Sequence, residues 1–175
     1  MALLTLLLGT GIRVSECVGL DIDDVNFDVG GIKIRRKGGN EAVVYFGEEV
    51  ETALLDYLEQ REHMIPAEGH ENALFLSLQN RRMAVRSVEK LVKKYTSRVN
   101  PLKRITPHKL RSTYGTELYK ETGDIYLVAN ILGHKDVNTT RKHYANLDEY
   151  RRHQAANAVH LREKNNYHNA TPPEN

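Results

Sequence analysis

Cysteine is nearly absent from this chain of 175 residues, in which Cys17 stands alone. One cysteine excludes an internal disulfide framework and fits the reducing environment of the cytosol. No run of about 18 apolar residues is present, which excludes a membrane-spanning helix. The apolar opening, residues 1–8, lacks the basic start and the small-residue cleavage site of a secretory signal. We therefore predict a cytoplasmic protein.

Recognisable cofactor motifs are also lacking. The sequence contains neither a Walker-type phosphate loop nor a dinucleotide-binding fingerprint. The histidines make no convincing metal set: His153 and His160 have no carboxylate or cysteine near them at ligand spacing. We therefore predict no metal and no cofactor.

The length, with 27% charged and 40% apolar residues, is typical of one soluble globular domain. We expect this domain to span residues 1–164 and to be followed by a polar tail, residues 165–175, that is disordered. The chain begins abruptly in an apolar helical pattern with no capping residue before it. This favours a domain cut from a longer protein.

Charge is unevenly distributed along the chain, although the net formal charge is only +2. Residues 81–111 contain eleven Lys or Arg and one acid, whereas residues 41–71 contain nine Asp or Glu and one base. A basic stripe of this kind usually faces a polyanion. The alternative is a solvated helix face balanced by its acidic neighbour.

Local patterns predict a mainly α fold with a small antiparallel β-sheet, in the α+β class. Three β-branched runs at residues 25–29, 32–36 and 42–46 predict strands, and the turn Lys37-Gly38-Gly39-Asn40 joins the last two as a hairpin. Apolar periodicity and capping residues predict the helices. These cover residues 1–8, 13–20, 48–62, 84–99, 107–121, 124–133 and 147–164.

The chemistry-bearing side chains concentrate between residues 105 and 144, where His108 and Arg111 share a helix face. His134 follows Gly133, and Tyr144 ends the stretch. A phosphate beside His108 and Arg111 would meet an imidazole and a bidentate guanidinium. A phenol is about one-thousandth ionised at neutral pH, so Tyr144 becomes a useful nucleophile only beside a base or cations. The alternative for His108 and Arg111 is that they are ordinary surface residues. The alternative for Tyr144 is a role in packing.

Two upstream cations complete the candidate set. Arg13 lies between apolar segments and needs an anionic partner; the structural alternative is an ion pair with Glu16 or with one of three nearby aspartates. Those aspartates are Asp21, Asp23 and Asp24. Lys37 occupies the hairpin tip, where it either blunts a sheet edge or reaches into a DNA groove. Lys33, Arg35 and Arg36 also lie on this hairpin, and Lys33 is the alternative to Lys37.

Four separated motifs occur in a fixed order: GTGIRVSE around Arg13, the Lys37 hairpin, HKLR, and LGH followed by Tyr144. In this combination the chain resembles the tyrosine recombinase family, the phage integrases and Xer-type recombinases. The resemblance covers residues 3–160. Tyr144 lies ten residues after His134, where the Xer-type pattern has nine, and some mobile-element integrases resemble this sequence in that spacing.

The resemblance implies a catalytic domain that lacks the family's N-terminal DNA-clamping domain. It implies that Tyr144 attacks a DNA phosphate, that Arg13, Arg111 and His134 contact its oxygens, that Lys37 protonates the leaving oxygen and that His108 accepts the phenolic proton. Double-stranded DNA is the implied partner, bound by a homo-tetramer. Residues 147–164 are the candidate helix for contact with a neighbouring protomer, and packing of this helix within its own chain is the alternative. Phosphate-contact candidates are Arg86, Lys93, Lys94 and Arg141.

Two other functions remain open from the sequence. A type IB topoisomerase shares the implied chemistry and would relax DNA instead of recombining two sites. A non-catalytic DNA-binding regulator would use the basic helix over residues 84–99 for phosphates and would need no nucleophile.

Overall fold

The computed structural model describes residues 1–36, 38–134, 136–138, 140–142 and 144. Lys37, the predicted helix over residues 147–164 and the predicted tail over residues 165–175 lie outside the described residues. The elements run in the order α1 (Ala2–Thr10), α2 (Val14–Val18), η1 (Ile22–Asp24), β1 (Val25–Asn26), β2 (Gly31–Arg35), β3 (Glu41–Tyr45), α3 (Glu48–Glu62), α4 (Val85–Val99), α5 (Pro107–Thr122) and α6 (Ile125–Ile131). The prediction of a mainly helical fold with a small sheet is confirmed.

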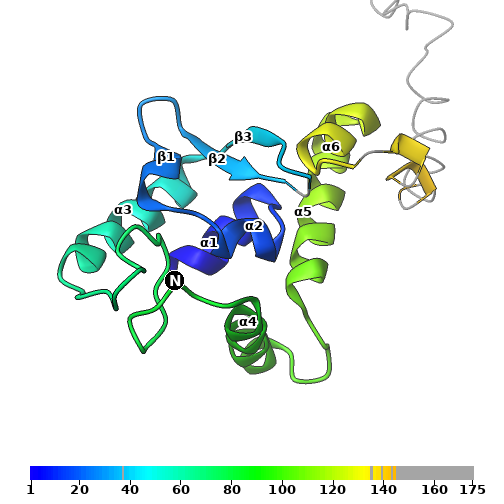
Figure 1. The fold of residues 1–175 in the computed structure, drawn as a ribbon. Helices are drawn as coiled ribbons and strands as arrows, with labels where there is room; N and C mark the ends of the chain where they lie inside the picture. Colours follow the sequence, from blue (N-terminus) through cyan, green and yellow to red (C-terminus); the bar gives the residue numbers. More distant parts are fainter. Residues whose placement is uncertain (37, 135, 139, 143, 145–175) are drawn as a thin grey trace, which may run out of the picture.

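Helix α1 lies at the centre of the molecule and packs against α3 and α5 (Figure 1). Leu6 and Leu7 of α1 and Leu54 of α3 are fully buried, and each stabilises the fold by about 1.5–3 kcal/mol. The apolar opening predicts a helix buried on every side. That expectation is too broad, because Leu8 is 48% exposed.

The sheet has the order β1-β2-β3 with both pairs antiparallel. Ile32 and Ile34 of β2 point into the core and are buried, and Ile32 lies opposite Val44 of β3. The predicted strand over residues 25–29 is shorter than expected, because only Val25–Asn26 pairs with β2. The chain then turns, and Asn26 Oδ1 accepts bonds from the next backbone amides.

Capping residues set the ends of α5 and α6, which carry most of the candidate site. The Thr106 hydroxyl accepts from the Lys109 amide ahead of Pro107, and Gly123 ends α5 in the left-handed conformation. Asp124 then caps α6 through two backbone amides. Helix α6 ends at Ile131, two residues before the predicted end at Gly133.

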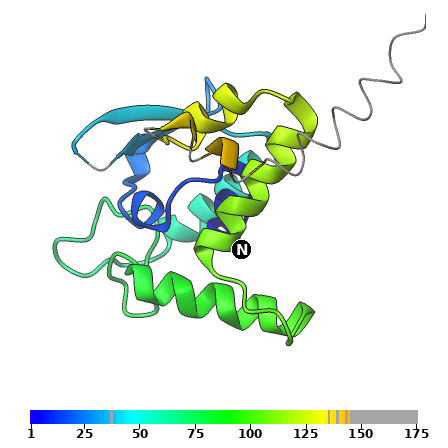
Figure 2. The same cartoon turned by 90° about the vertical axis from the view of Figure 1, so that its right-hand side faces the viewer.

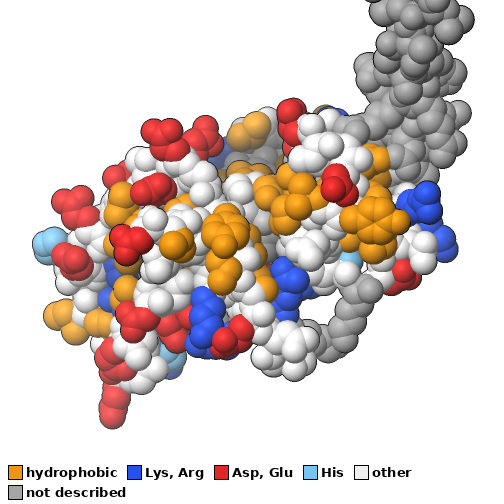
Figure 3. Space-filling model, turned by 90° about the horizontal axis from the view of Figure 1, so that it is seen from above, with side chains coloured by type: hydrophobic (Ala, Val, Ile, Leu, Met, Phe, Trp, Pro, Cys, Tyr) orange, Lys and Arg blue, Asp and Glu red, His pale blue; other side chains and the backbone are white. Residues whose placement is uncertain are grey.

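The acidic and basic stretches lie on different sides of the domain. Seen from above, Asp and Glu side chains gather on the left, where Figure 1 places α3 (Figure 3). Helix α4 runs along the lower edge (Figure 2); Val88 and Val92 face the core, while Arg86, Lys93 and Lys94 are exposed. In the described part of the chain, no helix is both long and apolar enough to cross a membrane.

Candidate active site

The C-terminal end of α6 brings together two arginines that are 98 positions apart in the sequence (111 − 13). Arg111 donates to the carbonyl oxygen of Leu132 and, through its other terminal nitrogen, to that of Gly11. Arg13 donates to the carbonyl oxygen of Gly133 at 3.2 Å. The last carbonyls of a helix have no partner within the helix, so arginine side chains fill a structural need there.

Glu16 holds Arg13 from the other side. Its carboxylate accepts from Arg13 Nη1 at 2.9 Å and from the Arg13 amide at 2.7 Å, and its side chain is 3% exposed. The expected ion pair between these two residues is therefore present. The ion pair fixes the orientation of the Arg13 guanidinium and leaves further N–H groups of Arg13 available to a ligand.

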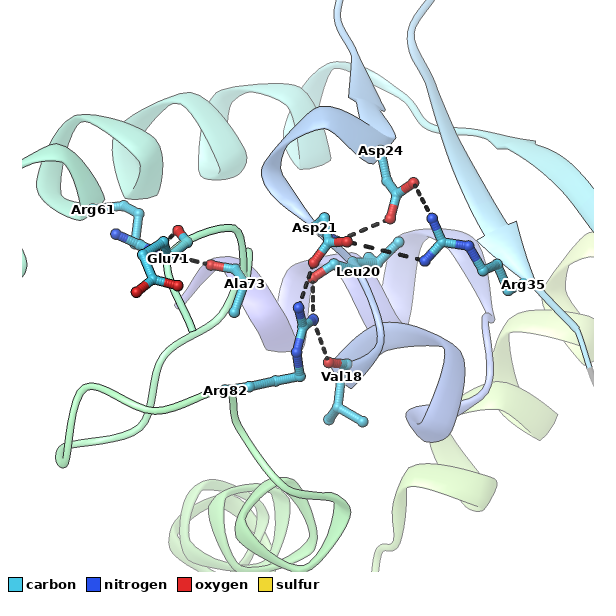
Figure 4. Close-up of polar contacts among 9 residues, drawn as sticks. All are labelled: Val18, Leu20, Asp21, Asp24, Arg35, Arg61, Glu71, Ala73 and Arg82. Atoms are coloured by element: carbon cyan, nitrogen blue, oxygen red, sulfur yellow. Dashed lines mark hydrogen bonds and ion pairs between the residues drawn. The ribbon is translucent and has the colours of Figure 1, made fainter. Parts of the chain in front are cut away.

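Two of the alternative partners of Arg13, Asp21 and Asp24, pair with other arginines. Figure 4 shows Asp21 between Arg82 and Arg35, with Asp24 also facing Arg35. Arg82 additionally donates to backbone carbonyls at the end of α2. These contacts join the loop after α3 to α2 and the sheet, and they serve the fold.

Arg111 is 7% exposed, so its charge is largely removed from water. Burial lowers the pKa of Arg111 to about 10; the charge of Arg13 acts in the same direction, Glu16 opposes it, and Arg36 lowers it further. The guanidinium stays cationic at neutral pH. Clustered, partly desolvated cations of this kind are suited to an anionic ligand.

His134 directly follows the carbonyls that the two arginines bind. Its Nδ1 lies 2.7 Å from the hydroxyl of Thr140, and its backbone amide donates to Ala129. Thr140 is 1% exposed, so a buried hydroxyl fixes the ring. Sequence reasoning did not find this role of Thr140, because a threonine ahead of a tyrosine carries no specific signal.

Tyr144 packs on the surface of α5 and is only 3% exposed. Its ring lies 5.3 Å from that of Tyr119 at an interplanar angle of 33°. Burial raises the pKa of the Tyr144 phenol, while a hydrogen bond with the Thr116 side chain and the charge of Arg111 act to lower it. The structure therefore places the predicted nucleophile near Arg111, with its hydroxyl covered.

The raised pKa of Tyr144 gives a direct test. Phenolate absorbance is measured as a function of pH for wild type and for Tyr144→Phe. The difference between the two curves reports the titration of Tyr144, and we expect its midpoint to lie above the ordinary pKa of 10. Because the pKa of Tyr144 is higher in the folded state, the unfolded chain loses this proton at a lower pH than the folded chain does. The contribution of Tyr144 to the free energy of unfolding therefore declines as the pH rises from the unfolded pKa through the folded pKa. A midpoint at or below 10 would contradict the buried position.

Gly115 makes the close approach of Tyr144 to α5 possible. A Cβ at this position would lie 2.4 Å from the Tyr144 hydroxyl and 2.9 Å from Leu132 Cδ1. We expect Gly115→Ala to destabilise the domain, because overpacking costs about 1–3 kcal/mol and alanine gains about 1 kcal/mol in a helix. Urea unfolding measures this, with Thr113→Ala, exposed on the same helix, as the control. A net gain of stability would show that Tyr144 and Leu132 do not approach Gly115 this closely.

For His108 and Arg141, the described residues show no hydrogen bond or ion pair with this cluster. His108 is exposed on the first turn of α5, and among the described residues no hydrogen bond or ion pair is found for it. Its predicted role is neither supported nor opposed by a contact. Arg141 is exposed close to Tyr144 in the sequence, and Lys37 is not described.

Arg36 is the site residue that sequence reasoning missed. Its terminal nitrogens donate to the carbonyl oxygens of Asn130 at 3.4 Å and Ile131 at 3.0 Å. With Arg13, Gly133 and His134 it lines an open cleft of about 950 Å³ between the sheet and the end of α6. The crowd of basic residues at the hairpin was visible in the sequence, but nothing there distinguished Arg36.

Comparison with solved structures places this fold among the catalytic domains of tyrosine recombinases. The XerA recombinase superposes with a TM-score of 0.77 at 31% identity, over 87% of this chain and 57% of that one. The XerH site-specific recombinase bound to its difH substrate gives a TM-score of 0.74 at 28% identity, over 89% of this chain and 45% of that one. A Tn1549 transposon integrase bound to transposon end DNA gives 0.69 at 27% identity, over 90% and 58%.

The model of the phage integrase family matches residues 1–151, and the chain belongs to this family. Tyrosine recombinase XerD of Staphylococcus haemolyticus is 34% identical over 160 residues, which is 91% of this chain and 54% of that protein. Tyrosine recombinase XerS of Streptococcus agalactiae is 40% identical over 143 residues, or 80% and 40%. The chain spans about half the length of the curated relatives it matches.

Proposed function

We propose that this chain is the catalytic domain of a site-specific DNA recombinase that breaks and rejoins strands through Tyr144. The observation that carries the proposal is the convergence of Arg13, Arg111 and His134 on the end of α6, next to a tyrosine whose pKa is influenced by Arg111. Family membership supports the same chemistry. The related XerH and Tn1549 proteins were solved with DNA.

In the proposed reaction the Tyr144 oxygen attacks the scissile phosphorus while the bond from phosphorus to the 5′ oxygen breaks. The phenolic proton passes to His108, and Lys37 supplies a proton to the departing 5′ oxygen. The products are a 3′-phosphotyrosyl bond and a free 5′-hydroxyl. Attack by a 5′-hydroxyl of another strand reverses these transfers and rejoins the DNA.

Arg13, Arg111 and His134 stabilise the negative charge that grows on the non-bridging oxygens. Fixed donors that meet charge as it develops are typically worth about 10²–10³ each in rate. The arginines are held by Glu16 and by backbone carbonyls before substrate arrives. Little reorganisation is then needed at the moment of attack. The Tyr144 hydroxyl, in contrast, must leave its buried position on α5 to reach a phosphate.

DNA binding is assigned to the exposed basic residues of α4 and to Arg141. Arg86, Lys93 and Lys94 are exposed while the apolar side of α4 faces the core, and such cations neutralise phosphates without reading sequence. Assembly as a tetramer on DNA through residues 147–164 is part of the proposal. That segment lies outside the described residues.

Capture of a covalent complex tests the function. A pool of nicked duplexes with a randomised core is incubated with the full chain; the nick lets the short cleaved fragment diffuse away, so the adduct cannot reverse. We expect a DNA-linked protein that survives denaturation, and sequencing of the trapped DNA gives the preferred site. Absence of any adduct from a pool that covers all core sequences would contradict the proposal.

The trapped site also separates the rival functions. Recombination between two copies of the site on one plasmid is expected from a recombinase. Relaxation of supercoils without exchange of flanking DNA would favour the topoisomerase. DNA binding with no adduct would favour the non-catalytic regulator.

A further inference from the structure

Two neighbouring arginines at the end of β2 make contacts on opposite sides of the chain. Arg35 faces Asp24 at 3.6 Å and Glu41 at 3.8 Å, on the side of η1 and β3. Arg36, the next residue, reaches across to α6 and binds the carbonyls of Asn130 and Ile131. Successive side chains of an extended segment point to opposite sides, so one arginine serves the sheet and the other serves the helix end.

The guanidinium of Arg36 also packs on Gly133. A Cβ at Gly133 would lie 2.4 Å from Arg36 Nη1 and 2.5 Å from its Cζ, and Gly133 has a φ of +59°. Gly133 is thus held between two arginines, since its carbonyl oxygen accepts from Arg13. Because Gly133 directly precedes His134, its position determines the position of the His134 backbone.

The contacts of Arg36 do not suit direct DNA binding. Both terminal nitrogens donate to backbone carbonyls. Its Nε is buried and, among the described residues, has no hydrogen-bond partner. With Nε buried, Arg36 cannot present the side-on pair of N–H groups, Nε and one terminal nitrogen, with which a guanidinium can bind an oxyanion in a bidentate way. The helix end, by contrast, offers two carbonyls and the negative end of the helix dipole.

We propose that Arg36 is a positioning residue that fixes the C-terminal end of α6, and with it His134, without contacting DNA itself. The inference rests on the proposed function for its effect on rate, but its structural part stands on the free protein. Arg36 joins the hairpin to the segment that Arg13 and Arg111 also bind. Its loss releases two of the carbonyls that anchor this segment.

Hydrogen exchange of the free full chain tests the structural part. The amides of Gly133 and His134 donate to Asn130 and Ala129 and report on the helix end. We expect their exchange to rise about tenfold or more in Arg36→Ala, because local opening becomes easier. Arg35→Ala removes the same charge one residue away and should leave both amides protected. Equal protection in wild type and Arg36→Ala would overturn the proposal.

Cleavage of the trapped site at saturating DNA tests the effect on chemistry. We expect Arg36→Ala to lower the single-turnover rate about 100-fold, the size of loss that a misplaced catalytic group produces. Arg36→Lys should stay impaired, because one ammonium cannot replace a planar fork on two carbonyls. The slope of the logarithm of DNA affinity against the logarithm of salt concentration should be the same in Arg36→Ala as in wild type. A wild-type rate in Arg36→Lys, with a slope reduced by about 0.9 in Arg36→Ala, would identify a phosphate contact and overturn the proposal.

A double-mutant cycle with His134 separates positioning from a general loss of fold. If Arg36 acts through His134, Arg36→Ala should cost less than about threefold once His134 is already alanine, because coupled residues are not additive. An undiminished 100-fold loss in that background would overturn the proposal. Failure of wild type to form any adduct would instead reject the proposed function, and the exchange comparison would still decide the role of Arg36.

Discussion

Tyr144→Phe is expected to abolish covalent cleavage, with a loss of at least about 10⁴ in rate, as for other enzymes that lose their nucleophile. The reaction needs a phenolic oxygen on phosphorus, and the proposal assigns that oxygen to Tyr144. Single-turnover cleavage of the trapped site measures the loss.

The variant should fold normally. Its ring keeps the contact with Tyr119, and the lost hydrogen bond with Thr116 is worth about 1 kcal/mol. Retained DNA binding together with a free energy of unfolding within about 1 kcal/mol of wild type would confirm that only chemistry is lost. Cleavage at more than a hundredth of the wild-type rate would show that another group attacks the DNA.

Arg111→Ala is expected to lower the cleavage rate by about 10²–10³, the typical cost of one fixed donor at a developing charge. Two buried carbonyls, those of Gly11 and Leu132, also lose their donor, at about 1–3 kcal/mol each. Removal of a desolvated charge offsets part of that cost. The loss of activity should therefore exceed what the loss of stability explains.

Two variants on the same helix sharpen this result. Arg111→Lys keeps the charge but cannot donate in two directions with the same geometry, and we expect it to remain strongly impaired. Lys120→Ala removes an exposed charge that pairs with Glu117 and should retain the wild-type rate at saturating DNA. A cleavage rate of Arg111→Ala within threefold of the wild-type rate would show that Arg111 is not a catalytic residue.

Local signals predicted the elements well, because capping and periodicity act within a few residues. Thr106, Asp124 and the hairpin glycines marked their elements correctly. The strand over residues 25–29 was predicted too long, since β propensity does not reveal that Asn26 turns the chain back. Residues 73–78 are a short apolar run whose periodicity fits neither a helix nor a strand, and in the structure Ala73 and Leu76 form isolated bridges.

The site was predictable only where its contacts are local or its motifs are specific. Glu16 lies three residues from Arg13, so their ion pair could be anticipated. Arg36 binds carbonyls 94 and 95 positions away, and a backbone acceptor has no signature in the sequence. The buried position of Tyr144 likewise depends on Gly115 and Leu132, which only the folded chain brings to it.

The most direct test of the account is to identify the residue that carries the DNA. After digestion of the trapped complex with protease and nuclease, mass spectrometry locates the nucleotide-modified peptide among the nine tyrosines of the chain. We predict one modified residue, Tyr144, joined to a 3′-phosphate. A nucleotide on any other residue, or a 5′-phosphate linkage, would contradict the assignment of Tyr144 as the nucleophile.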